Sequence, residues 1–145
     1  MVAIRNSAKA LILRDGALLA AIGKTSDDGM YYILPGGGQE AGETLAETVV
    51  RECREEVGAE VRVDTLLYIR ERIEEHLHRV EFTFLCTLLS EPDTTLATEP
   101  DMRQTGIAWL PLAALIDVPF YPEGIRERLP TIIREGVTVY LGNLP

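Results

Sequence analysis

The fold is decided by residues 34–59, LPGGGQEAGETLAETVVRECREEVGA. Three glycines follow Pro35, and such a run is costly in chain entropy unless the backbone needs positive φ or close approach to a ligand. A helix is predicted next, because Thr44 and Glu47 form a capping-box pattern and Gly58 stands where a helix ends. Its apolar residues recur on one face, at Ala46, Val49, Val50, Cys53 and Val57. That face would pack against a sheet.

Acidic residues gather on the same helix. Glu52, Glu55 and Glu56 are three or four positions apart and can project toward one region, where their charges repel. Arg51 can offset part of this repulsion by pairing with Glu47 and Glu55. Clustered carboxylates without neighbouring Cys or His ligands select a hard ion such as Mg²⁺ or Mn²⁺. The alternative is a solvated helix face, and the adjoining glycine loop favours the metal site.

These residues resemble the Nudix box of the MutT-like hydrolases. The resemblance rests on Gly37, Glu43 and the segment RECREEVGA at residues 51–59. Cys53 and Ala59 stand where that pattern has bulky aliphatic residues. The resemblance implies an α+β fold, an α/β/α sandwich with a mixed, curved β-sheet between helices. It also implies metal-dependent hydrolysis of a pyrophosphate bond in a nucleoside diphosphate linked to another moiety.

The resemblance also implies roles for individual residues. Glu52, Glu55 and Glu56 would bind Mg²⁺ or Mn²⁺, and the carbonyl of Gly36 would be a further ligand. Arg51 would orient a carboxylate through a salt bridge. With the three glutamates, Arg51 completes the expected catalytic set.

Substrate contacts and a general base have candidates outside the helix. Arginine binds phosphate through two parallel hydrogen bonds, and a histidine can contact a phosphate or a base. The candidate substrate-binding residues are Arg5, Arg70, Arg72 and His78, with a surface or turn role as the alternative for the histidine. One of the box glutamates can be the general base, and Glu81, Glu99 and Asp101 are candidates outside the box.

Length and composition limit the other possibilities. We expect a single domain over residues 1–145, large enough to bury a core. The formal charge of −9 shows no basic footprint for nucleic acid. No apolar run reaches membrane-spanning length, and Cys53 and Cys86 fit a reduced core, so we expect a cytoplasmic protein. The expected partner is a small nucleotide, and a homodimer is compatible with the sequence.

Strand patterns surround the helix. An Asp-Gly turn at residues 15–16 predicts a hairpin. The predicted strands are residues 7–13, 18–22, 30–34, 61–63, 65–73, 78–89, 105–110 and 137–141. Residues 90–102 form a polar loop, residues 111–115 a helical turn, and residues 123–135 a helix interrupted by Pro130.

Two alternatives to the hydrolase belong to other functional classes. A non-catalytic Nudix-like domain would bind a nucleotide as a sensor, but such domains usually lose box carboxylates that this chain keeps. An isomerase on the same fold would need an additional catalytic cysteine. Cys53 lies on the apolar face of the helix, which argues against that role.

Overall fold

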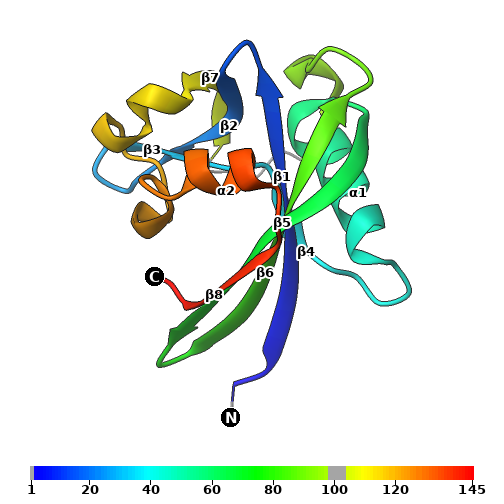
Figure 1. Cartoon of the computed structure of the whole chain (residues 1–145). Helices are drawn as coiled ribbons and strands as arrows, with labels where there is room; N and C mark the ends of the chain where they lie inside the picture. The colour runs from blue at the N-terminus through cyan, green and yellow to red at the C-terminus, as the bar shows by residue number, and fades with distance from the viewer. Residues whose placement is uncertain (1, 98–103) are drawn as a thin grey trace.

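The chain folds around one mixed β-sheet with helices on both faces (Figure 1). The structure is a computed structural model, and it describes residues 2–97 and 104–145. The strands are β1 (Ile4–Arg14), β2 (Ala17–Lys24), β3 (Met30–Ile33), β4 (Gly36–Gly38), β5 (Val61–Glu74), β6 (Leu77–Leu88), β7 (Gln104–Pro111) and β8 (Val139–Asn143). The α-helices are α1 (Leu45–Val57) and α2 (Leu129–Glu135), and short 3-10 helices span Thr94–Leu96, Leu112–Asp117 and Glu123–Ile125.

Strand pairing makes the sheet mixed. The main order is β3-β2-β1-β6-β5-β8, with β4 paired to β1 and β7 paired to β2. The pairs β1–β6 and β5–β8 are parallel, and the other named strand pairs are antiparallel. The short glycine strand β4 therefore lies at one edge of β1, directly before the chain enters α1.

Two apolar clusters cover opposite faces of the sheet, as alternation along a strand requires. Ala8 and Ala10 of β1 pack with Val49 and Cys53 of α1. Leu11, which points to the other face, packs in the cluster that contains residues of the C-terminal helices. The layers confirm the predicted α/β/α sandwich. None of the helices in the described part of the chain is long and apolar enough to cross a membrane.

The elements follow the predicted order, and the largest differences have local causes. Residues 61–74 form one strand, and the predicted break at Asp64 is a register shift between Val63 and Thr65. Pro130 lies in the first turn of α2 and does not interrupt a helix, because the first turn of a helix needs no N–H from proline. At the predicted hairpin, Asp15 and Gly16 both have positive φ, which fits a two-residue turn.

Candidate functional site

Glycines at residues 36 and 37 let the sheet edge and the helix come into contact. Gly36 has φ of 149°, and a Cβ there would lie 2.2 Å from the carbonyl oxygen of Ala8. A Cβ on Gly37 would lie 2.5 Å from Oε1 of Glu52. Gly36 thus requires glycine, because backbone atoms fill the place of a side chain. A larger residue at position 37 would displace the Glu52 carboxylate.

The caps predicted for α1 are present. The Thr44 hydroxyl accepts a hydrogen bond from the Glu47 amide at 3.1 Å, and Glu47 Oε1 accepts one from the Thr44 amide at 3.2 Å. Gly58 closes the helix in the left-handed conformation, with φ of 62°. The predicted pairing of Arg51 with Glu47 is wrong, because the Glu47 carboxylate serves the capping box.

Arg51 instead connects the glycine strand to three carboxylates. Its Nε and Nη2 donate to both carboxylate oxygens of Glu43, at 3.0 and 2.7 Å. Its Nη1 donates to Glu52 at 3.0 Å and to Glu55 at 3.1 Å. Its Nη2 also reaches the carbonyl oxygen of Gly38 at 3.0 Å. These bonds raise the pKa of the guanidinium, with Glu43 as the largest cause.

Glu43 holds this arrangement from the loop side. Besides Arg51, its carboxylate accepts hydrogen bonds from the Glu40 amide at 2.9 Å and from the Thr48 hydroxyl at 2.8 Å. The hydrogen bonds from Arg51 are the main reason that the pKa of Glu43 falls to about 2. Glu43 is therefore a support that fixes Arg51, which fits the position it has in the box.

The three predicted metal-binding glutamates lie near the glycine strand. Glu56 Oε2 accepts a hydrogen bond from the Gly36 amide at 3.0 Å. Glu52 lies against Gly37, and Glu52 and Glu55 share the Nη1 group of Arg51. The residues that carry the family resemblance thus come together where β4 and α1 meet.

The donor chemistry of this cluster fits a hard divalent cation, because all its side-chain donors are carboxylate oxygens. Within residues 2–97 and 104–145, however, no group of three or more His, Cys, Asp or Glu side chains is arranged to hold a metal ion. Arg51 lies between two of the predicted ligands and bonds both of them. The metal ligands therefore stay a prediction that rests on residue chemistry and proximity.

The other predicted substrate residues fall into two groups. Arg5 lines one cavity beside β1, and Arg70 and Arg72 line a second one. His78 lines neither of these cavities, and its Nε2 lies 2.7 Å from Glu71 Oε1. The structure does not bring His78 together with the arginines.

The candidate bases outside the helix have different outcomes. Glu81 is buried, and its Oε2 accepts a hydrogen bond from Arg70 Nε at 2.6 Å. Its carboxylate is thus engaged in a buried ion pair with Arg70. Glu99 and Asp101 lie outside the described residues.

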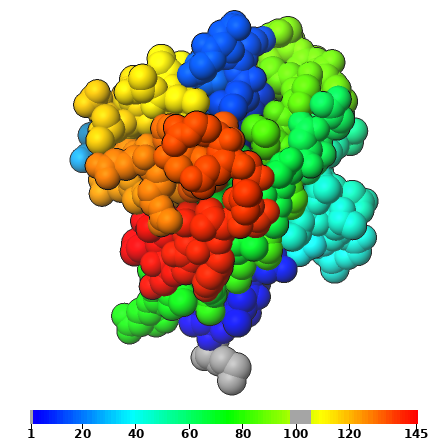
Figure 2. Space-filling model, viewed as in Figure 1, coloured from blue at the N-terminus to red at the C-terminus, as the bar shows by residue number. Residues whose placement is uncertain are grey.

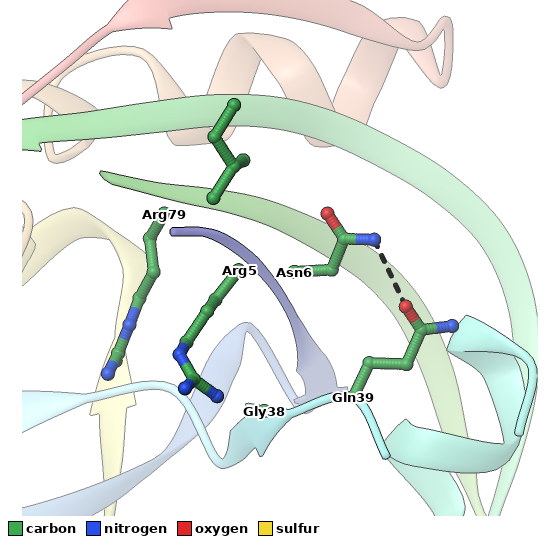
Figure 3. A pocket seen from close by; sticks show the side chains of 6 residues that line it. Arg5, Asn6, Gly38, Gln39 and Arg79 are labelled. Atoms are coloured by element: carbon green, nitrogen blue, oxygen red, sulfur yellow. Dashed lines mark hydrogen bonds between the residues drawn. The ribbon is translucent and has the colours of Figure 1, made fainter. Parts of the chain in front are cut away.

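Two neighbouring cavities share Arg79. The first, of about 380 Å³, is lined by Ile4, Arg5, Asn6, Gly38, Gln39 and Arg79. The second, of about 320 Å³, contains Lys9, Tyr31, Arg70, Arg72, Arg79 and Tyr121 in its lining. Figure 3 shows Arg5 and Arg79 extending to the same side beside Gly38, while Asn6 turns away and donates a hydrogen bond to Gln39.

Sequence reasoning missed Lys9 and Arg79 as site residues. Lys9 pairs with Gly36 across β1 and β4, and its Cδ lies 2.7 Å from the position of a Cβ on that glycine. Arg79 pairs with Arg5 across β1 and β6. The available signal was the alternation of Arg5, Ser7 and Lys9 in the first strand, which places three polar side chains on one face.

The two cysteines are core residues, as expected. Cys53 and Cys86 are buried and reduced. Burial raises the pKa of both thiols, that of Cys86 to about 12. A buried thiol with a raised pKa is a poor nucleophile, so Cys53 does not support the isomerase alternative.

A glycine strand facing an acidic, arginine-bridged helix at the edge of a mixed sheet defines a class of α/β/α domains. A model of the NUDIX domain family matches residues 1–132. The chain therefore belongs to the Nudix family, which confirms the resemblance of the glycine loop and the helix.

Two curated relatives are similar over 70% of this chain. The human 8-oxo-dGDP phosphatase is 34% identical over 102 residues, which are 30% of its own length. A putative nudix hydrolase of Caenorhabditis elegans is 35% identical over 107 residues, which are 27% of its length. The chain thus spans less than a third of each of these relatives.

Solved structures match over more of their length. The MutT NUDIX hydrolase of Burkholderia pseudomallei is 28% identical, with a TM-score of 0.71 over 87% of this chain and 97% of that chain. A NUDIX hydrolase of Nitrosomonas europaea, 18% identical, has a TM-score of 0.78 over 94% of this chain and 93% of that chain. The second likeness shows the fold alone, and both agree with the predicted architecture.

Proposed function

We propose that this chain is a metal-dependent pyrophosphohydrolase that acts on a nucleoside diphosphate linked to another group. The observation that carries the proposal is the meeting of the glycine strand with the acidic helix. There, Glu56 accepts the Gly36 amide, Glu52 lies against Gly37, and Arg51 bridges the carboxylates. Such clusters bind the hard cations that neutralise phosphate oxygens.

Each residue of the cluster has a role in this proposal. Glu52, Glu55 and Glu56 hold Mg²⁺ or Mn²⁺, together with the main chain at Gly36. A bound cation of this kind lowers the pKa of a coordinated water and offsets charge on the phosphates. Arg51 keeps two of the carboxylates oriented toward the glycine strand.

The second cavity, which Lys9 lines beside the glycine strand, suits the organic part of such a substrate. Tyr31 and Tyr121 line it and make an edge-to-face contact, with ring centroids 6.3 Å apart. Aromatic faces of this kind can stack on a planar base. The similarity to an 8-oxo-dGDP phosphatase supports nucleoside diphosphates, including oxidised ones, as the first substrates to test.

The test is phosphate release from a nucleotide panel in Mg²⁺ or Mn²⁺, coupled to a phosphatase or a pyrophosphatase. The panel holds nucleoside di- and triphosphates, their 8-oxo forms, ADP-ribose, nucleotide-sugars and dinucleoside polyphosphates. We expect turnover of one class, lost with a chelator and in Glu56→Gln, and kept in Glu135→Gln, a matched change at an exposed residue of α2. Tight nucleotide binding without turnover would instead support the sensor alternative.

A further inference from the structure

The sheet face opposite α1 becomes cationic toward the beginning of β1. Lys9, Ser7 and Arg5 follow one another at every second position of the strand. Arg79 of β6 lies beside Arg5, and Arg72 of β5 lies beside Arg79. Three arginines therefore form one row across three neighbouring strands, which we call the arginine row.

Part of this charge has no partner among the described residues, whereas Arg72 is ion-paired with Glu74 at 2.8 Å. Arg5, Lys9 and Arg79 make no side-chain hydrogen bond or ion pair with any residue in the described ranges 2–97 and 104–145. Glu81, the acidic residue that lines the same cavity, is bonded to Arg70 at 2.6 Å. Like charges directly opposite each other in a sheet are destabilising. An anion from outside the chain would relieve this repulsion.

A buried hydroxyl without a partner lies on the same face of the sheet. Ser7 lies between Arg5 and Lys9 on β1, opposite Glu81, and is only 2% exposed. Its Oγ is buried without a hydrogen-bond partner among the described residues. An unsatisfied polar atom of this kind costs about 1–3 kcal/mol, and native structures contain few of them.

The arginine row borders space that reaches the glycine strand. Gly38 lines the first cavity together with Arg5, and Lys9 lines the second beside Gly36. Arg79 belongs to both cavities. Figure 3 shows the guanidinium groups of Arg5 and Arg79 on the same side as Gly38. A ligand at the glycine strand can thus extend to the row without crossing the core.

Distance separates the row from the proposed reaction centre. Lys9 pairs with Gly36, whereas Arg5 is four residues earlier in β1. At about 3.3 Å per residue, the two Cα positions lie about 13 Å apart. A diphosphate held beside Gly36 can meet Lys9, and a second anionic group farther along β1 can meet Arg5, whose cavity Arg79 shares.

We propose that the arginine row binds a phosphate monoester that the substrate carries in addition to its scissile diphosphate. This inference rests on the proposed function and narrows its substrate class to nucleoside diphosphate derivatives with a further phosphate. Arginine suits that group because its planar fork matches two phosphate oxygens.

Matched substrates that differ by one phosphate test the proposal. The pairs are ADP-ribose with its 2′-phosphate, and dephospho-coenzyme A with coenzyme A, which carries a 3′-phosphate. We expect kcat/KM to be at least tenfold higher for the phosphorylated member of one pair, mainly through KM. The pair that shows the preference identifies the position of the phosphate on the ribose.

Variants then assign the preference to the row. Arg79→Gln and Arg5→Gln change exposed residues and should reduce the preference to less than threefold, with a larger loss for the phosphorylated member than for the unphosphorylated one. Arg134→Gln is the matched control, because Arg134 is exposed on α2 and donates only to the Thr131 hydroxyl within the described chain. An equal loss for both members would overturn the proposal, because the arginines would then act on the scissile diphosphate. No preference in the wild-type protein would also overturn it.

A binding measurement separates this inference from the proposed function. Calorimetry in EDTA compares the Kd of each member of the two pairs without any turnover. One outcome is that no compound is hydrolysed, a phosphorylated member binds tenfold more tightly than its partner, and Arg79→Gln removes this difference in affinity. The arginine row would then be confirmed as a phosphate site, and the proposed hydrolysis would be wrong. Equal affinities within both pairs would overturn the row whether or not hydrolysis occurs.

Discussion

Two arginine–glutamate centres on opposite faces of the sheet differ in the charge around them. Arg51 donates hydrogen bonds to the carboxylates of Glu43, Glu52 and Glu55, and a fourth carboxylate, that of Glu40, lies 3.8 Å away. Negative charge is therefore in excess. Arg70 bonds Glu81, and the surrounding cavity adds further arginines and a lysine, so positive charge is in excess. An ion pair with balanced charge needs no ligand to neutralise it. An excess of positive or negative charge indicates that the site can bind a ligand of the opposite charge.

The difference assigns complementary tasks to the two faces. The acidic face suits a cation, and the cationic face suits the anionic parts of a substrate. The glycine strand joins them, since Gly36 contacts both Glu56 and Lys9. A phosphate-containing ligand can therefore lie across this strand, although the whole chain carries a net charge of −9.

Turnover provides the strongest test of this division. Glu56→Gln should lower kcat by about 10³-fold, because it removes a charged ligand from the acidic face. Glu81→Gln should change kcat by no more than about threefold, because its carboxylate is engaged by Arg70. Steady-state kinetics on one substrate compare the two variants. A comparable loss of kcat in Glu81→Gln would indicate that Glu81 is the general base. The division into an acidic cation-binding face and a cationic substrate-binding face would then be wrong.

Stability should respond in the opposite order. Arg70→Met leaves Glu81 buried without its partner and should lower the free energy of unfolding by about 3 kcal/mol. Urea unfolding measures the change. The double variant Arg70→Met/Glu81→Leu should recover most of the loss, because apolar residues of similar volume often replace a buried ion pair at little cost. No recovery would indicate that the pair also anchors the C-terminal segment, where Arg70 donates to the carbonyl of Leu144.

Ligand-induced stabilisation distinguishes the faces by the sign of the ligand. Mn²⁺ at ten times its Kd should stabilise the protein by about 1.4 kcal/mol, since only the folded state offers the site. Glu52→Gln should abolish this gain, and Arg79→Gln should leave it unchanged. Urea unfolding with and without Mn²⁺ gives the value. If Arg79→Gln removed the gain, the two faces would not be separate binding regions.

Sequence patterns predicted the acidic face better than the cationic one, for a physical reason. The caps of α1, its apolar stripe and the clustering of Glu52 and Glu56 follow from spacing within a single helix. The arginine row depends on the register between β1, β6 and β5, which unites Arg5, Arg79 and Arg72 from distant parts of the chain. Local periodicity does not specify such a register.

Strand β6, which pairs with β5, also shows that alternation within one strand does not specify contacts between strands. Alternation along β6 places Val80 and Phe82 on one face of the sheet and Glu81 and Thr83 on the other. The polar pair is nevertheless buried, with 8% and 1% exposure. Glu81 finds its partner Arg70 only through the pairing of β5 with β6. Polar residues on one face of a strand therefore do not by themselves indicate that this face is exposed to solvent.

The smallest expected effect concerns acid stability at the Arg51 centre. Hydrogen bonds from Arg51 lower the pKa of Glu43 from an ordinary 4.5 to about 2. The stabilisation from this shift is fully present above about pH 4.5 and is lost as the pH falls toward 2. Because the shift arises in a partly solvated cluster, we expect a contribution of about 1 kcal/mol. Urea unfolding between pH 6 and pH 2.5 measures it as the stability difference between the wild-type protein and Glu43→Gln.

That difference should shrink across this window, because the Glu43 carboxyl takes up its proton in the unfolded chain but stays largely ionised in the folded protein. The glutamine of the variant does not titrate. Asp64 and Asp93 also have lowered pKa values, but they are present in both proteins and cancel in the difference. A constant difference from pH 6 to pH 2.5 would mean that the charge of Glu43 contributes nothing. The bonds of Glu43 to Thr48 and to the Glu40 amide would then account for its stabilising effect, and Arg51 would be held by the helix carboxylates alone.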